Sequence, residues 1–140
     1  MTDWSGQRTN LLASKVRFHR YYALAAAVLF AVEVFIAFFV RDSFVRPVLG
    51  DVLAVMLVYC GLLSILRLPR SLAASLALLV GVVVEITQYL DVLTLLGLEA
   101  NPIARIVLGT TFSWGDIVAY AVGAILSIII DSAITARLEP

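Results

Sequence analysis

The chain has 140 residues, of which 62% are hydrophobic and only 14% are charged, whereas soluble domains are roughly 45–50% apolar and about 25% charged. This composition excludes an ordinary water-soluble protein. Ten basic and ten acidic residues leave no net charge, so we expect no basic surface for DNA or RNA and no nucleic-acid partner. The single cysteine, Cys60, has no second cysteine to pair with and lacks the Cys/His spacing of a zinc site. We therefore expect no metal and no other cofactor.

Four apolar runs are each long enough to span a bilayer, whose core of roughly 30 Å requires about 20 helical residues. They are residues 21–40, 48–66, 72–90 and 114–133. The first run contains Glu33 and exceeds the roughly 7–15 apolar residues of a signal peptide, so we interpret it as a retained helix. The sequence predicts an all-α integral membrane four-helix bundle over residues 21–133, between a basic tail at 1–20 and a short tail at 134–140.

The distribution of basic residues predicts the orientation of the bundle. Seven of them lie in the two tails or in the link between the second and third spans: Arg8, Lys15, Arg17, Arg20, Arg67, Arg70 and Arg137. The other three, Arg41, Arg46 and Arg105, lie in the remaining loops. Because positive charge favours the cytoplasmic side, we expect both termini in the cytoplasm and the loops 41–50 and 91–113 outside.

The second outer loop carries the usual marks of a short helix. Asn101 stands at the cap position, Pro102 at the first helical position and Gly109 just past the end, each of which is favoured there. We expect this helix either to lie on the outer membrane face or to dip into it. A surface loop with one helical turn is the alternative.

The two halves of the chain resemble each other. Ala31-Val-Glu33-Val aligns with Val83-Val-Glu85-Ile, and Gly50-Asp51-Val-Leu-Ala54 aligns with Gly115-Asp116-Ile-Val-Ala119. The Glu and the Asp are 18 residues apart in the first half and 31 apart in the second, which indicates an insertion in the second outer loop. Since both halves start on the same side, we predict a parallel tandem repeat of two helical hairpins.

Acidic residues are expected to gather at the outer end of the bundle. A helical rise of about 1.5 Å per residue places Glu33 and Glu85 roughly 18–20 Å up their spans, and Asp51 and Asp116 are expected to begin the returning helices, where capping alone could explain them. A carboxylate within a span costs up to about 2.5–3.5 kcal/mol, so it normally faces the bundle or a wet cavity and has a partner.

The arginines of the outer loops are the expected partners of these acids, and polar residues share the faces of the third and fourth spans. The candidate ligand-binding set is Glu33, Arg46, Asp51, Glu85, Gln88, Arg105, Asp116 and Tyr120. On the second span, the residues that share a helical face with Asp51 are Val55, Val58 and Leu62. This face therefore has no further polar side chain. We expect Asp131 and Glu139, near the cytoplasmic end, to be solvated. Ion pairs that merely hold helices together are the alternative interpretation.

Part of this pattern resembles the Glu-x-x-Gln, Arg, Asp-x-x-x-Asn-x-x-Gly signature of VanZ-like membrane proteins. The matching residues are Glu85-Ile-Thr-Gln88, Arg105 and Phe112-Ser-Trp-Gly-Asp116-Ile-Val-Ala-Tyr120-Ala-Val-Gly123, with Tyr120 where Asn is usual. From Tyr21 to Ile130 the chain is similar to a small bacterial branch related to that group and classed only as a domain of unknown function. The resemblance implies a bacterial inner-membrane protein, and the name-giving member is linked to low-level resistance to the glycopeptide teicoplanin.

The leading functional hypothesis is a non-enzymatic bundle whose outer polar cleft binds a lipid headgroup or another envelope ligand or precursor. Proton- or ion-coupled transport through the membrane-embedded glutamates is the first alternative, and it would call for a homodimer, since four helices enclose only a narrow path. An intramembrane envelope enzyme is the second alternative, because Glu85 and Asp116 are suited to acid–base work, although no nucleophile is evident.

Overall fold

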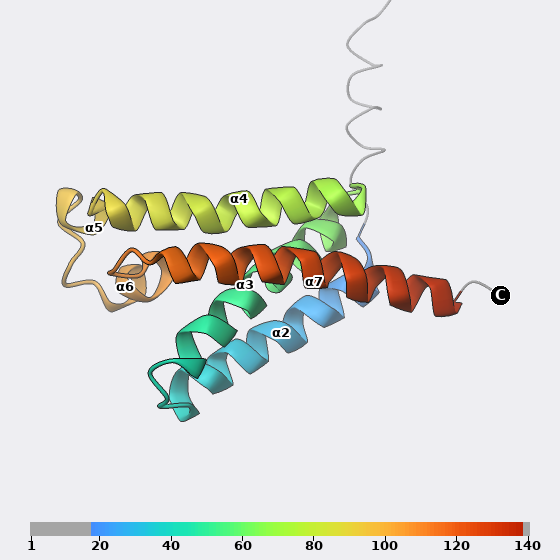
Figure 1. Ribbon diagram of the computed structural model, residues 1–140, viewed down its shortest axis with the longest axis horizontal. Coiled ribbons are helices and arrows are strands. Elements are labelled where there is room, and N and C mark those ends of the chain that lie inside the picture. The colour runs from blue at the N-terminus through green and yellow to red at the C-terminus, as the bar shows by residue number, and fades with distance from the viewer. Residues whose placement is uncertain (1–17, 139–140) are drawn as a thin grey trace, which may run out of the picture.

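In the computed structural model, residues 18–138 are described, and within that range the chain is helical without β-strands. Four long helices form the bundle: α2 (Arg20–Phe39), α3 (Val45–Ile65), α4 (Arg70–Tyr89) and α7 (Trp114–Leu138) (Figure 1). Two short helices, α5 (Val92–Leu95) and α6 (Pro102–Leu108), connect α4 to α7. The predicted all-helical fold with four long apolar helices is confirmed.

Each of the four long helices is long and apolar enough to cross a membrane, since 20 residues of helix reach about 30 Å. Large apolar side chains such as Phe30, Ile125 and Ile129 are more than half exposed, which suits a surface in contact with acyl chains. The molecule is therefore a multi-pass membrane protein. The last helix is longer than expected, because it continues to Leu138 instead of ending at residue 133.

The arrangement of the helices determines where a cavity can form. α3 packs against α2, α4 and α7, and α4 also packs against α7, but α2 does not pack against α4 within the described chain. Figure 1 shows α2 and α3 slanting away from α4 and α7 toward the end that carries α5 and α6. We call this end the loop end and the opposite one the termini end.

The core lies between α3, α4 and α7, where small residues bring the helices close together. It consists of Val55, Tyr59, Leu63, Ala73, Ala74, Ala77, Tyr120 and Ala124. At the crossing of α3 and α7, a Cβ added to Gly123 would lie 2.5 Å from the Val52 carbonyl oxygen. Close backbone approach of this kind is typical of helix contacts in membranes, where small residues replace large ones at the interface.

The start of α3 differs from the expectation. The helix begins at Val45, and the Asp42 carboxylate accepts hydrogen bonds from the Phe44 and Val45 amides at 2.8 and 2.7 Å. These two bonds lower the pKa of Asp42. Asp51 therefore lies inside the helix, more than a turn past its start, and capping does not account for it.

The predicted short helix in the loop between the third and fourth spans is confirmed as α6. Asn101 Oδ1 accepts hydrogen bonds from the amides of Ile103 and Ala104 at 3.0 and 3.1 Å, and Pro102 opens α6. Gly109 follows its end with a φ of +70°, a conformation that glycine adopts without a steric cost. The other short helix, α5, was not predicted.

The expectation that Asp131 is solvated is wrong. Its carboxylate is 11% exposed and accepts hydrogen bonds from Tyr59 Oη at 2.6 Å, Tyr22 Oη at 2.9 Å and Arg70 Nε at 3.1 Å. Asp131 thus joins all four long helices at the termini end. The error arose because its partners come from three other helices, which a reading along one helix does not bring together. Glu139 lies outside the described residues.

The second span also has more polar character than expected. Tyr59 is two helical turns beyond Asp51 on the same face of α3, it is 2% exposed, and its hydroxyl reaches Asp131. The row through Val58 and Leu62 misses this tyrosine, whose ring is part of the apolar core while its hydroxyl is polar.

Candidate functional site

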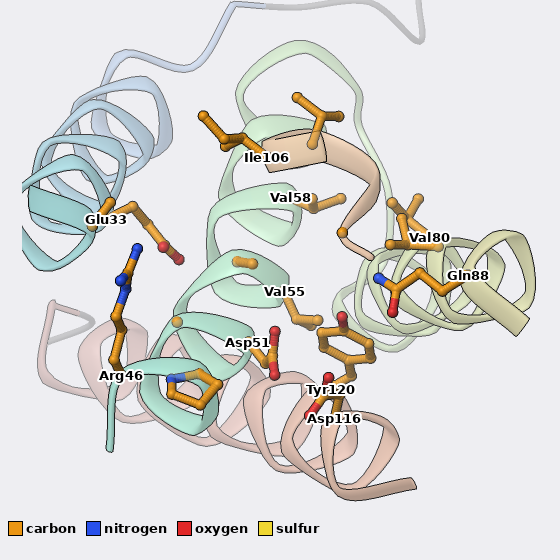
Figure 2. Close-up of a pocket in the computed structure, with 18 of the residues that line it drawn as sticks. Glu33, Arg46, Asp51, Val55, Val58, Val80, Gln88, Ile106, Asp116 and Tyr120 are labelled. Atoms are coloured by element: carbon orange, nitrogen blue, oxygen red, sulfur yellow. The ribbon is translucent and has the colours of Figure 1, made fainter. Parts of the chain in front are cut away.

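A cavity of about 470 Å³ opens at the loop end between α2, α3 and α4, with α6 and the start of α7 completing its walls. Its polar and charged lining residues are Glu33, Arg46, Asp51, Gln88, Thr110, Thr111, Asp116 and Tyr120. Figure 2 shows Glu33 and Arg46 on one side and Gln88 on the other, with Asp51, Asp116 and Tyr120 between them. Six of the eight predicted site residues therefore line one cavity.

Three of these side chains present buried acceptor atoms that have no hydrogen-bond partner among the described residues: Glu33 Oε1, Asp51 Oδ2 and Gln88 Oε1. Leaving a buried polar atom unpaired costs about 1–3 kcal/mol, more if it is charged. All three atoms belong to residues that line the same cavity. Their clustering is typical of a site that is completed by another molecule.

Glu85 does not line the cavity, but it binds Tyr120, which does. Its side chain is 0% exposed. Its carboxylate accepts hydrogen bonds from the Ser113 amide at 3.0 Å and from the Tyr120 hydroxyl at 3.2 Å. Glu85 thus joins α4 to the start of α7 and fixes the Tyr120 ring. The ring in turn lies so close to Gly81 that a Cβ there would be 2.7 Å from it.

The orientation of the Gln88 side-chain amide follows from its hydrogen-bond partner. Its amide nitrogen donates a hydrogen bond to the Leu108 carbonyl oxygen at 2.7 Å. Because a carbonyl can only accept, the nitrogen must face Leu108, which leaves the amide oxygen as the free group. Gly109 makes this contact possible, since a Cβ at this position would collide with the Gln88 amide.

The two predicted arginines occupy different places. Arg46 lies in the first helical turn of α3 and lines the cavity, where Figure 2 shows it directed toward Glu33. Among residues 18–138, Arg70 and Asp131 form the one salt bridge, so Arg46 and Glu33 do not form an ion pair. The alternative interpretation, in which Glu–Arg ion pairs hold these helices together, is wrong for the described residues, because neither Glu33 nor Glu85 forms such a pair.

Arg105 does not join the cluster, contrary to the expectation. It is exposed and belongs to α6, which contributes Ile106 and Val107 to the cavity instead. The physical reason lies in the longer second loop. Arg46 is part of a spanning helix, whereas Arg105 belongs to a separate short helix that covers the cavity with its apolar side chains.

The remaining lining residues are apolar and partly reach the outer surface. Val80, Ile106 and Val107 line the cavity, and they are 47%, 80% and 65% exposed. Residues of α2 and α4 face each other across it, although these helices do not pack together. The cavity therefore connects the polar cluster with the apolar outside of the bundle. Sequence reasoning missed Ile106, Val107, Thr110 and Thr111, because their positions depend on how the loop folds back.

The comparison with protein families adds one assignment. The family described as "Protein of unknown function (DUF2809)" matches residues 40–124, which include α3, α4, α6 and the cavity-lining start of α7. The chain belongs to the DUF2809 family. No curated protein and no solved structure matches this DUF2809 chain. The matched segment contains every cavity-lining residue that α3, α4, α6 and α7 contribute, and it leaves out α2 with Glu33.

Proposed function

We propose that this DUF2809 protein binds the polar headgroup of a membrane amphiphile, a lipid or a lipid-linked envelope molecule, in the cavity at the loop end. The observation that carries the proposal is the set of three unpaired buried acceptors that surround one cavity together with Arg46. Such a site stays costly until a ligand supplies the missing partners.

The shape of the site favours an amphiphile over a small water-soluble ligand. Polar side chains gather around Asp51, whereas Val80, Ile106 and Val107 lead from the cavity to the outside of the bundle. A lipid would place its headgroup at the polar side chains and its acyl chains between α2 and α4. α2 and α4 both line the cavity without packing against each other, and on this proposal the lipid enters between them from the bilayer.

The resemblance to VanZ-like proteins supports a place in the bacterial inner membrane and a role in envelope or glycopeptide tolerance. With the predicted orientation, we infer that the loop end faces outward, where envelope precursors and glycopeptides are met. On this proposal Arg46 holds an anionic group of the ligand, because a guanidinium matches phosphate and carboxylate oxygens with paired donors.

Lipid extraction with the purified protein tests the proposal. The protein is isolated in native membrane discs, and the co-purified amphiphiles are quantified by mass spectrometry for the wild type and for Arg46→Ala. We expect Arg46→Ala to lose at least one amphiphile that the wild type enriches. Arg105→Ala, which removes an exposed arginine outside the cavity, serves as the matched control and is expected to retain it. Identical lipid contents in all three proteins would contradict the proposal.

A second candidate is proton- or cation-coupled transport, favoured by the fact that each long helix contributes a carboxylate to this end: Glu33, Asp51, Glu85 and Asp116. The apolar core around Val55 and Ala77 separates this end from Asp131, so a path across the bundle would require an additional opening. Proteoliposome flux that is lost in Glu33→Gln would support transport, and the absence of flux in the wild type would count against it.

A further inference from the structure

The three buried atoms without a hydrogen-bond partner among the cavity-lining residues of the described chain are all acceptors, and this restricts the chemistry of the ligand. Glu33 Oε1 and Asp51 Oδ2 are carboxylate oxygens, and Gln88 Oε1 is an amide oxygen whose orientation is fixed by the bond to Leu108. The Tyr120 hydroxyl donates a hydrogen bond to Glu85 at 3.2 Å. A ligand group that binds next to these oxygens must therefore carry hydrogen-bond donors.

The charges around the cavity also favour a positively charged ligand group. Three lining residues are acids, Glu33, Asp51 and Asp116, whereas Arg46 is the one basic residue from the described chain that lines it. Charges removed from water are stable only when they are paired. A ligand that carries a positive charge would supply the balance that Arg46 alone does not.

A protonated amine fits this side better than a metal ion. The described part of the chain has no group of three His, Cys, Asp or Glu side chains arranged to hold a metal. A primary ammonium has three N–H donors, and Asp51 Oδ2 and Gln88 Oε1 are unpaired acceptors beside the same cavity. Asp51 comes from α3 and Gln88 from α4, so they approach such a group from two helices.

Arg46 supplies the opposite recognition element. It lies in the first turn of α3, near the end of a spanning helix and hence at the level where lipid phosphates lie, and the positive end of a helix dipole also favours an anion there. Glu33 is directed toward Arg46 without pairing with it. The cavity thus presents Arg46, with Glu33 beside it, on one side, and the Asp51 and Gln88 acceptors away from it.

We propose that the ligand is zwitterionic, with a primary ammonium held by Asp51 and Gln88 and a phosphate held by Arg46. An aminoethyl phosphate headgroup, as in phosphatidylethanolamine, has this chemistry. The inference rests on the proposed function, since it specifies the headgroup that the same cavity binds. The lipid and the free headgroup, O-phosphoethanolamine, share this chemistry, and they differ only in the acyl chains.

Lipid binding measured by native mass spectrometry tests the inference. The protein in detergent is offered equal amounts of phosphatidylethanolamine, phosphatidylcholine, phosphatidylglycerol and N-acetyl-phosphatidylethanolamine. The last three lack N–H donors on a positive charge. We expect wild-type protein to retain phosphatidylethanolamine at least about tenfold better than each of them, because a site built for donors rejects analogues that lack them.

Single-residue variants separate the ammonium-binding half of the site from the phosphate-binding half. Asp51→Asn, which keeps the size of the side chain, is expected to reduce the preference for phosphatidylethanolamine to less than about threefold. Arg46→Ala is expected to lower retention of phosphatidylethanolamine and phosphatidylglycerol alike, and Arg105→Ala is expected to change neither. Because the wild-type lipid series needs no variant, the inference is tested even if Asp51→Asn fails to fold.

The outcomes of these binding experiments distinguish failure of the zwitterion from failure of the proposed function. Displacement of the lipid by O-phosphoethanolamine would support the zwitterion and show that the headgroup suffices. No displacement, together with equal retention of all four lipids, would show that the acyl chains alone bind and would overturn the inference. Equal retention of phosphatidylglycerol and phosphatidylethanolamine, with loss of both in Arg46→Ala, would overturn the zwitterion but leave the proposed function intact. Retention that is indifferent to Arg46→Ala would overturn both.

Discussion

At the scale of single residues, Glu85 shows how an acid inside a membrane span is accommodated. Its carboxylate is completely buried, and its two partners are the Ser113 amide and the Tyr120 hydroxyl. Neither partner is an arginine, so hydrogen-bond donors from the start of α7 stabilise the group. Glu85 therefore has a supporting role beside the cavity, whereas Asp51 and Glu33 keep free oxygens within it.

Removing the hydroxyl of Tyr120 tests this role. Tyr120→Phe leaves Glu85 Oε1 without its donor, and we expect the free energy of unfolding to fall by about 1–3 kcal/mol. Tyr21→Phe removes a hydroxyl from an exposed tyrosine and is expected to change stability by less than about 0.5 kcal/mol. Unfolding in mixed micelles measures both. Equal stability of the two variants would show that the bond to Glu85 contributes nothing.

At the termini end, Asp131 is the acid that joins helices through hydrogen bonds, as Glu85 does at the loop end. Asp131→Ala removes the acceptor of Tyr22, Tyr59 and Arg70 at once. Hydrogen bonds between membrane helices average about 0.6 kcal/mol, so we expect a loss of roughly 2 kcal/mol for the three. Arg137→Ala, an exposed change on the same helix, is the control. A loss no larger than that of the control would mean that the network does not hold the helices together.

At the scale of the helices, the crossing of α3 and α7 depends on a glycine. A Cβ at Gly123 would meet the backbone of Val52, which belongs to the helix and cannot rotate away, whereas a Cβ at Gly61 meets nothing within 4 Å. The two positions therefore form a matched pair with opposite expectations.

We expect Gly123→Ala to destabilise the protein by about 1–3 kcal/mol, because α3 and α7 must separate to admit the methyl group. Gly61→Ala is expected to be neutral or to stabilise by up to about 1 kcal/mol, since alanine is the better helix former. Thermal unfolding of both variants in the same detergent compares them. Similar effects of the two changes would contradict the close contact of α3 and α7.

The helices also show which features of the fold a sequence can predict. Long apolar runs and the marks at Asn101, Pro102 and Gly109 are local, and they predicted the four spans and α6. The hydrogen bonds from Asp42 to the start of α3 were missed, because they depend on how the loop turns back on the Phe44 and Val45 amides. The start of α3 at Val45 then changed the interpretation of Asp51 from a capping residue to one inside the helix.

The candidate site was predicted in part for the same reason. Glu33, Asp51, Gln88, Asp116 and Tyr120 share an end of the bundle once the spans are known, so their convergence follows from topology. The place of Arg105 depends on the fold of the inserted loop, and the partners of Asp131 depend on three other helices. Neither can be obtained from the spacing of residues along one segment.

At the scale of the whole molecule, the orientation in the membrane remains a prediction that labelling can test. In a Cys60→Ser background, single cysteines are introduced as Ser43→Cys, Glu99→Cys and Arg137→Cys, all at exposed positions. The excess of basic residues at the termini end predicts that a membrane-impermeant maleimide added to intact cells labels the first two and spares the third. Labelling of Arg137→Cys alone would reverse the orientation and place the cavity on the cytoplasmic side.

The cavity at the loop end is the feature on which the functional account depends. Its direct test is an electron cryomicroscopy map of the protein in a bilayer disc that contains phosphatidylethanolamine. We expect headgroup density between Arg46 and Asp51, with an acyl chain leaving between α2 and α4. A cavity filled only by water, or a collapsed one in which Glu33 pairs with Arg46, would contradict the account.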